Sequence, residues 1–248
     1  MKKLGLVLFL GIVLNGCTKE PITFTFKTYE KKTTLPCQED CTTTKVTIPI
    51  AHHSEIIADS INNKVFSVVK EIVYFGEKAY PSKDYNDLLA SFINSYEELS
   101  KDFPDYDMPW EATIEGKVIY QTENLINIEM NHYSFTGGAH GYGGLRSILI
   151  DAKTGKSITN AHLFYDIKGF EQLAEQKFRK RFKIPSKDPI NSTGLWFKNE
   201  KFHLPENIFY NKKGLLLYYN QYEIASYAEG PIALLLPYQE VEGWLKLK

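Results

Sequence analysis

Apolar and polar residues alternate along the chain with a period that changes several times, and each change marks an expected element. Alternation with period two predicts strands that begin near Ile22 and near Val46. Two helical patterns follow, one from Ser54 to Gly76 and one ending before Pro104, because residues of these types cap or end helices. The residues expected on the inner faces of the two helices are Ile57, Ile61, Val65, Val68, Val69 and Ile72, and then Leu88, Leu89, Phe92, Tyr96, Leu99 and Phe103.

After residue 109 the pattern is mainly of the strand type, interrupted by one basic amphipathic helix at about 168–182. Aspartate and glycine at the ends of 151–155 predict a turn there. The predicted strands of this part are 110–121, 124–135, 145–151, 201–204, 207–210, 215–219 and 231–237. The order of elements predicts an α+β fold with mainly antiparallel sheets, two helices in the N-terminal half and one main helix in the C-terminal half.

The first seventeen residues predict export and lipidation. Lys2 and Lys3 precede an apolar run over 4–14, which has about half of the ~20 residues needed to cross a membrane. Residues 14–17 (LNGC) have the spacing of a bacterial lipobox, and an ordinary signal peptide with a chance cysteine is the alternative. We expect cleavage after residue 16, acylation of Cys17 and a stable lipid anchor. The expected location is the cell envelope outside the cytoplasm, in the outer membrane of a Gram-negative bacterium.

Composition excludes some functions. Loss of residues 1–16 removes two lysines and leaves 27 basic against 30 acidic side chains, a net charge of −3. Such a balanced chain has no electrostatic footprint for nucleic acid. The 16 tyrosines and 15 phenylalanines favour packed β-sheet, although tyrosine is also enriched at interfaces.

Two cysteines remain after lipidation, Cys37 and Cys41, with three residues between them. In an extracytoplasmic compartment this spacing favours a small-loop disulfide. Zinc requires about four ligands and no second cysteine pair is present, while a thioredoxin-type redox pair has two intervening residues and opens a helix. We therefore predict a structural bridge, with no metal and no other cofactor.

Several segments in order carry a resemblance to a known family. They are 133–141 (YSFTGGAHG), 151–156 (DAKTGK), 202–207 (FHLPEN), 214–220 (GLLLYYN), 222–231 (YEIASYAEGP) and 236–238 (LPY). Together they resemble the DUF4163/DUF3298 two-domain family, found as the extracytoplasmic region of the lysozyme-binding sigma-V anti-sigma factor and as the N-terminal module of a peptidoglycan deacetylase. The resemblance covers essentially all of the mature chain.

The resemblance implies a division of the chain. Residues 1–16 are the expected lipoprotein signal peptide and 17–35 the lipid anchor with the first strand. Residues 36–144 resemble the deacetylase-associated domain (DUF4163), and 145–248 resemble the receptor's C-terminal domain (DUF3298). The sequence shows neither the cytoplasmic and transmembrane parts of the anti-sigma factors nor the catalytic domain of the deacetylase. Ser226 stands where the family usually has proline.

The glycine-rich segment 136–141 is the first candidate for chemistry. Gly137, Gly138 and Gly141 permit tight backbone conformations around His140, which could act as a base or a metal ligand. Neither helical nor hairpin spacing pairs another histidine with it, so metal binding is not expected. We interpret the segment as an interdomain turn whose imidazole bonds to the backbone.

Tyrosines near the C-terminus form the second candidate, a binding surface. Its residues are Tyr218, Tyr219, Tyr222, Tyr227 and Pro231. A β-core with a tyrosine corner is the alternative, but alternation cannot bury all four rings on one face. We therefore expect a non-enzymatic, lipid-anchored binding module of the cell envelope, recognising a lysozyme-like muramidase or peptidoglycan. The alternatives are an enzyme acting on cell-wall sugars through His140 and an envelope scaffold.

Overall fold

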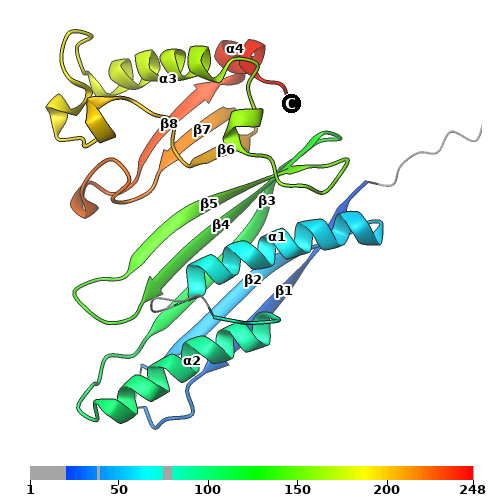
Figure 1. Ribbon diagram of the computed structural model, residues 1–248, viewed down its shortest axis with the longest axis vertical. Helices are drawn as coiled ribbons and strands as arrows, with labels where there is room; N and C mark the ends of the chain where they lie inside the picture. Colours follow the sequence, from blue (N-terminus) through cyan, green and yellow to red (C-terminus); the bar gives the residue numbers. More distant parts are fainter. Residues whose placement is uncertain (1–20, 38–39, 75–79, 248) are drawn as a thin grey trace, which may run out of the picture.

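Two β-sheets, one of five strands and one of three, form the framework of the molecule (Figure 1). The computed structural model describes residues 21–37, 40–74 and 80–247. The predicted signal peptide, Cys17 and the predicted helix stop at Gly76 lie outside the described residues. The strands are β1 Thr23–Lys32, β2 Thr43–His52, β3 Glu111–Gln121, β4 Leu125–Phe135, β5 Tyr142–Asp151, β6 Asn207–Asn211, β7 Gly214–Tyr219 and β8 Ile232–Pro237. The helices are α1 Glu55–Val73, α2 Tyr85–Asp102, α3 Ile167–Phe182 and the short α4 Tyr238–Val241.

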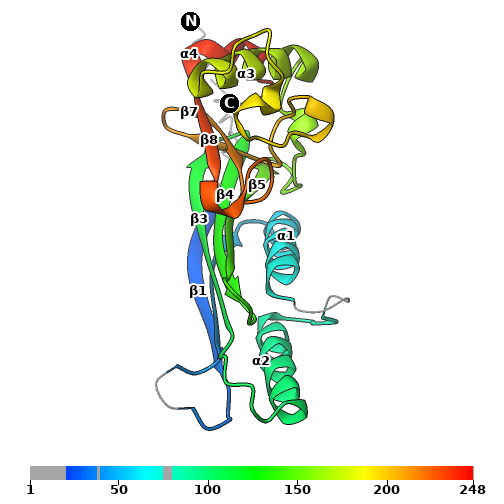
Figure 2. The same cartoon turned by 90° about the vertical axis from the view of Figure 1, so that its left-hand side faces the viewer.

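The first sheet has the order β1-β2-β3-β4-β5. Strands β2 and β3 are parallel and every other pair is antiparallel. Helices α1 and α2 lie between β2 and β3 in the sequence and cover one face of the sheet (Figure 2). The α+β prediction with mainly antiparallel sheets and its distribution of helices is therefore confirmed.

The helices form where apolar side chains recur on one face. In α1, Ile61, Val65 and Val69 are buried at spacings of four residues. The α2 helix begins at Asp84, whose carboxylate accepts a hydrogen bond from the Asp87 backbone amide at 2.9 Å. Phe103 was expected on the inner face of α2, but it is 60% exposed because the helix ends at Asp102 and the chain turns away.

The second domain packs α3 against the three-stranded sheet β6-β7-β8, at one end of the first sheet (Figure 2). The predicted strand at 201–204 is wrong, since this segment forms no strand. Its apolar character has another cause: the Phe202 ring packs against the rings of Phe178 and Phe197, with centroids about 5.5 Å apart. An apolar side chain that enters the core from a loop can therefore give the sequence the pattern that is typical of a strand.

Asparagine side chains join the two sheets. On β5, the last strand of the first sheet, the backbone amide and carbonyl of Leu145 both bond to the side-chain amide of Asn220 at 2.9 Å. The Ser147 amide donates to the side chain of Asn207 at 2.9 Å. Asn127 of β4, fully buried, accepts from the Tyr210 amide at 2.8 Å. We call this set of bonds the asparagine seam.

Strand β5 bears on the division of the chain. It spans Tyr142–Asp151, so the predicted boundary between residues 144 and 145 falls inside it, and β5 completes the first sheet by pairing with β4. The two domains have separate hydrophobic cores, and Leu125 and Leu149 from the first sheet contribute to the second core. No helix among the described residues is long and apolar enough to cross a membrane.

Candidate functional site

Two loops from different sheets meet on one side of the molecule (Figure 1). Residues 136–141 join β4 to β5, and residues 220–231 join β7 to β8. The first loop contains Gly137 and Gly138, whose φ angles of +95° and +89° lie in the region that glycine tolerates best. A side chain at Gly137 would also collide with the hydroxyl of Tyr106. The glycines therefore allow this loop to pack closely onto the first domain.

Three rings gather where the loops meet, and we call them the aromatic shelf: His140, Tyr222 and Tyr227. The His140 and Tyr227 rings stack with centroids 4.0 Å apart, and the Tyr222 centroid lies 5.7 Å from that of Tyr227. The Gly141 carbonyl oxygen accepts from His140 Nδ1 at 3.0 Å, so Nε2 is left to accept from the Tyr222 hydroxyl at 3.4 Å. The shelf thus joins side chains from both domains.

Tyr222 occupies an unusual backbone conformation. Its φ angle is +67°, in the left-handed region that costs a residue with a side chain about 1–2 kcal/mol. The turn is held by the next residue, because the Glu223 carboxylate accepts from the backbone amides of Asn220 and Glu206 at 2.9 and 3.0 Å. This conformation leaves the Tyr222 side chain 48% exposed at the junction of the domains.

A polar cleft of about 210 Å³ adjoins the shelf. Its lining comes from both domains and consists of His132, Tyr142, Arg146, Glu206, Asn220, Gln221, Tyr222 and Glu223. The Arg146 guanidinium lies 3.7 Å from the Glu206 carboxylate, and these side chains are 41% and 78% exposed. Burial raises the pKa of the Glu223 carboxyl, although its hydrogen bonds from the backbone amides of Glu206 and Asn220 oppose this shift.

Two of the lining residues, Asn220 and His132, are closely surrounded by the rest of the protein. Asn220 fits against β5 because residue 144 is glycine: a Cβ there would lie 2.5 Å from the Asn220 side-chain oxygen. His132 is buried, and its burial together with the nearby charge of Arg146 lowers its pKa to about 4. His132 is therefore neutral near pH 7. Within the described ranges, no group of three histidine, cysteine or acidic residues could hold a metal ion.

The structure separates the other predicted binding residues. Tyr219 is fully buried, and its hydroxyl donates to the His203 carbonyl at 2.6 Å, as a core tyrosine does. Tyr218 is half-buried and meets the Phe209 ring edge-on at 6.1 Å. Pro231 is exposed and lines a separate groove of about 480 Å³ beside Arg181. Only Tyr222 and Tyr227 of the five belong to the shelf.

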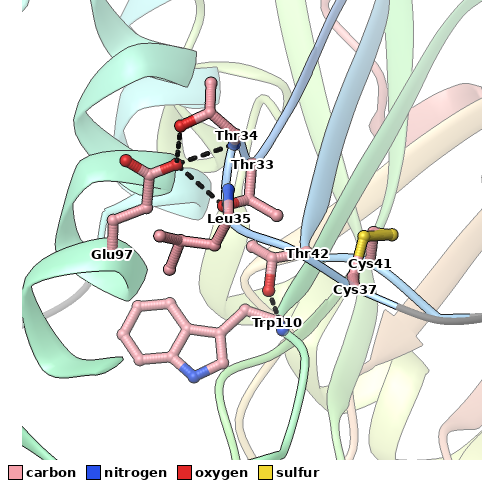
Figure 3. Close-up of a disulfide and its surroundings, with 8 residues drawn as sticks. All are labelled: Thr33, Thr34, Leu35, Cys37, Cys41, Thr42, Glu97 and Trp110. Atoms are coloured by element: carbon pink, nitrogen blue, oxygen red, sulfur yellow. Dashed lines mark hydrogen bonds between the residues drawn. A yellow bond between two sulfur atoms is a disulfide. The ribbon is translucent and has the colours of Figure 1, made fainter. Parts of the chain in front are cut away.

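The Cys37–Cys41 disulfide is present, with Cα atoms 5.4 Å apart, at the end of the first sheet remote from the second domain (Figures 2 and 3). One carboxylate oxygen of Glu97 on α2 accepts from Thr33 and from the amide and hydroxyl of Thr34. These bonds lower the pKa of the Glu97 carboxyl, the Thr34 amide contributing most. The bridge therefore belongs to a structural hairpin docked on α2, away from the shelf.

Reasoning from sequence alone did not find Arg146, Glu206, Asn220 or Glu223. Glu206, Asn220 and Glu223 lie inside the segments that carry the family resemblance, which is the one signal that could have marked them. Their roles depend on contacts with β5 that only the fold provides.

Comparison with known proteins agrees with this two-part organisation. Residues 36–142 match the family model described as "Deacetylase PdaC", and residues 165–239 match the DUF3298 family of unknown function. The two matches follow one another along the chain, which is consistent with a DUF3298 two-domain family. The resemblance drawn from the sequence segments is confirmed. A search of the curated proteins gave no match.

Two solved structures share the arrangement of this chain. A DUF3298 family member from Bacteroides fragilis NCTC 9343 is 20% identical with a TM-score of 0.70, and the match covers 92% of this chain and 95% of that chain. A DUF3298 family protein from Pseudomonas aeruginosa PAO1 is 21% identical with a TM-score of 0.64, covering 92% and 96%. At these identities the likeness shows the fold alone.

Proposed function

We propose that this protein is a lipid-anchored, non-enzymatic binding module of the cell envelope that recognises peptidoglycan. The observation that carries the proposal is the aromatic shelf with its adjoining cleft, built from loops of both domains. Ligand sites combine apolar or aromatic walls with a few convergent polar groups, and they often occur between domains. The shelf supplies the rings, and the cleft supplies amide, carboxylate and guanidinium groups.

The bonding of the polar groups favours binding over catalysis. Both ring nitrogens of His140 are engaged, one with the Gly141 carbonyl and one with the Tyr222 hydroxyl. Both oxygens of Glu223 accept backbone amides. A general base needs a free lone pair within hydrogen-bond reach of the proton that it removes. The polar atoms of both side chains are already used in bonds that hold the loops.

The size of the cleft favours a glycan over a protein partner. The cleft of about 210 Å³ is smaller than the pockets of about 300–1,000 Å³ that hold drug-sized ligands, which suits one sugar-sized group. A stable protein partner would need about 800 Å² of matching surface on each side. Half-exposed Tyr222 beside the cleft offers an amphipathic ring to a sugar.

The anchor part of the proposal rests on Cys17 and its lipobox spacing. Strand β1 begins at Thr23, so few residues separate the anchor from the folded domain. Cys17→Ala should abolish labelling by a palmitate analogue and prevent stable membrane attachment. Normal labelling of this variant would remove the anchor from the proposal.

Sedimentation with purified sacculi tests the binding function. A chain starting at residue 18 keeps every described residue and should sediment with sacculi. Tyr222→Ala should weaken binding about tenfold, since an exposed aromatic anchor is typically worth more than about 1 kcal/mol. Tyr165→Ala removes a more exposed ring elsewhere, 71% against 48% for Tyr222, and should leave binding unchanged. Binding to a purified lysozyme without binding to sacculi would assign a muramidase as the partner instead.

A further inference from the structure

We propose that the cleft beside the aromatic shelf binds a carboxylate group of the ligand, with Arg146 as the charged contact and Tyr142 and Tyr222 as flanking rings. The proposal rests on the proposed function, because it names the acidic group of the ligand bound at the same site. In peptidoglycan that group has two sources, the lactyl ether of the acidic sugar and the carboxylates of the stem peptide.

Arg146 is available for a ligand. Its ion pair with Glu206 is 3.7 Å long, beyond hydrogen-bond distance, and both side chains are well exposed. Ion pairs of this kind contribute little to stability, so exchanging the partner costs little. The guanidinium group presents several donors in one plane and binds a carboxylate through two parallel hydrogen bonds. A ligand carboxylate at shorter distance would therefore displace Glu206.

Glu206 is arranged to leave. Its backbone amide is fixed by the Glu223 carboxylate at 3.0 Å, while its side chain is 78% exposed and returns to water when displaced. The Glu223 carboxylate is held by the backbone amides of Glu206 and Asn220, and the ion pair of Arg146 is with Glu206. The Glu206 carboxylate therefore lies beside Arg146 until the ligand carboxylate displaces it.

Other lining groups match an acidic ligand with an apolar side. Tyr142 and Tyr222 are both about half exposed and line the cleft together with Arg146, one from β5 and the other from the 220–231 loop. His132 shows that the Arg146 charge acts inside the cleft, since that charge adds to burial in lowering the His132 pKa. The combination selects a carboxylate attached to a ring or an aliphatic group.

Calorimetric titration of the chain from residue 18 tests this inference with three probes. They are the neutral disaccharide of N-acetylglucosamine, N-acetylmuramic acid with its free lactyl carboxylate, and muramyl dipeptide, whose carboxylate lies on the peptide. At least one acidic probe should bind about fivefold or more tighter than the neutral one. The source of the carboxylate follows from which acidic probe is preferred.

Two variants should act in opposite directions. Arg146→Gln should weaken the preferred acidic probe about tenfold, the equivalent of about 1.4 kcal/mol, and leave the neutral probe unchanged. Glu206→Gln removes the competitor and should tighten the acidic probe about two- to threefold. Lys117→Gln is the control, because it removes an exposed cation that pairs with Glu115 outside the cleft, and it should change neither probe.

The inference is overturned if the three probes bind equally, or if Glu206→Gln weakens acidic binding as Arg146→Gln does, because the ion pair would then serve only to hold the loops. Sacculus binding that survives Arg146→Gln without any preference for acid refutes the inference and keeps the proposed function. If acidic fragments bind through Arg146 but the protein does not bind sacculi, the inference stands and the proposed function is refuted. Thermal unfolding of each variant confirms that the fold is intact.

Discussion

The two domains of this chain bury very different residues. The core of the first domain is mostly aliphatic, with Phe92 and Trp110 as its large fully buried rings. The second core contains Phe164, Phe170, Phe178, Phe197, Phe202, Tyr210 and Tyr219. Five long strands and two helices offer many inward positions, whereas three short strands and one long helix offer few. Aromatic side chains, which bury about 150–250 Å² each, fill the second core with fewer residues.

The difference teaches how to interpret the tyrosine-rich C-terminal segment. Tyr219 ends a strand, points into the aromatic core and is fully buried. Tyr222, three residues later, lies in a loop with left-handed backbone and is half exposed. Aromatic abundance is therefore largely a property of the second core, and the ring of Tyr222 is available to a ligand because a loop carries it.

Removing the central ring of the aromatic core should have the largest effect. Phe178 is fully buried and contacts Phe182, Phe197, Phe202 and Tyr219. Phe178→Ala should lower the free energy of unfolding by about 4 kcal/mol, because the cavity cannot be refilled by rigid neighbours. Val65→Ala in the aliphatic core should cost about 2 kcal/mol. Urea denaturation measures both losses, and equal losses would contradict the contrast between the cores.

The disulfide should contribute about half as much as Phe178. Replacing Cys37 and Cys41 by serine frees a five-residue loop and should destabilise the protein by about 2 kcal/mol in the chain-entropy account. Segment-resolved hydrogen exchange should place the loss in the first domain, since the hairpin docks on α2 through Glu97. Chemical reduction of the unaltered protein serves as the matched control. A loss spread over both domains would show that they unfold as one unit.

The smallest expected effect is a pH dependence caused by His132. Its folded pKa of about 4 lies below the ordinary histidine value of 6.5, so the unfolded chain binds more protons below pH 6.5 and stability falls as the pH falls. From pH 7.5 to 5.5 the loss should be about 1 kcal/mol. His132→Asn, which cannot titrate, should lack this component in a comparison of urea midpoints. Identical pH profiles for the two proteins would contradict the assignment.

Local patterns predicted local structure well. The periodicity of α1 and α3, with Ile61, Val65 and Phe178 inward, predicted helices whose buried faces the structure confirms. The segment 201–204 misled because Phe202 enters the core from a loop. The shelf could not be assembled from sequence, since its contact between Tyr222 and His140 joins residues 82 positions apart. The sequence marked the segment 136–141 and the tyrosines of the 220–231 loop separately. The contact between them depends on how the second domain packs against β5.

The asparagine seam covers an edge of the first sheet that would otherwise be exposed. Strand β5 ends the first sheet, and its outward amides and carbonyl groups find partners in Asn207, Asn220 and the Ile158 amide, all from the second domain or its approach. Without them β5 would be a bare edge, the feature by which sheets join one another into aggregates. The second domain is in this sense a covalently attached cap on the β5 edge of the first sheet.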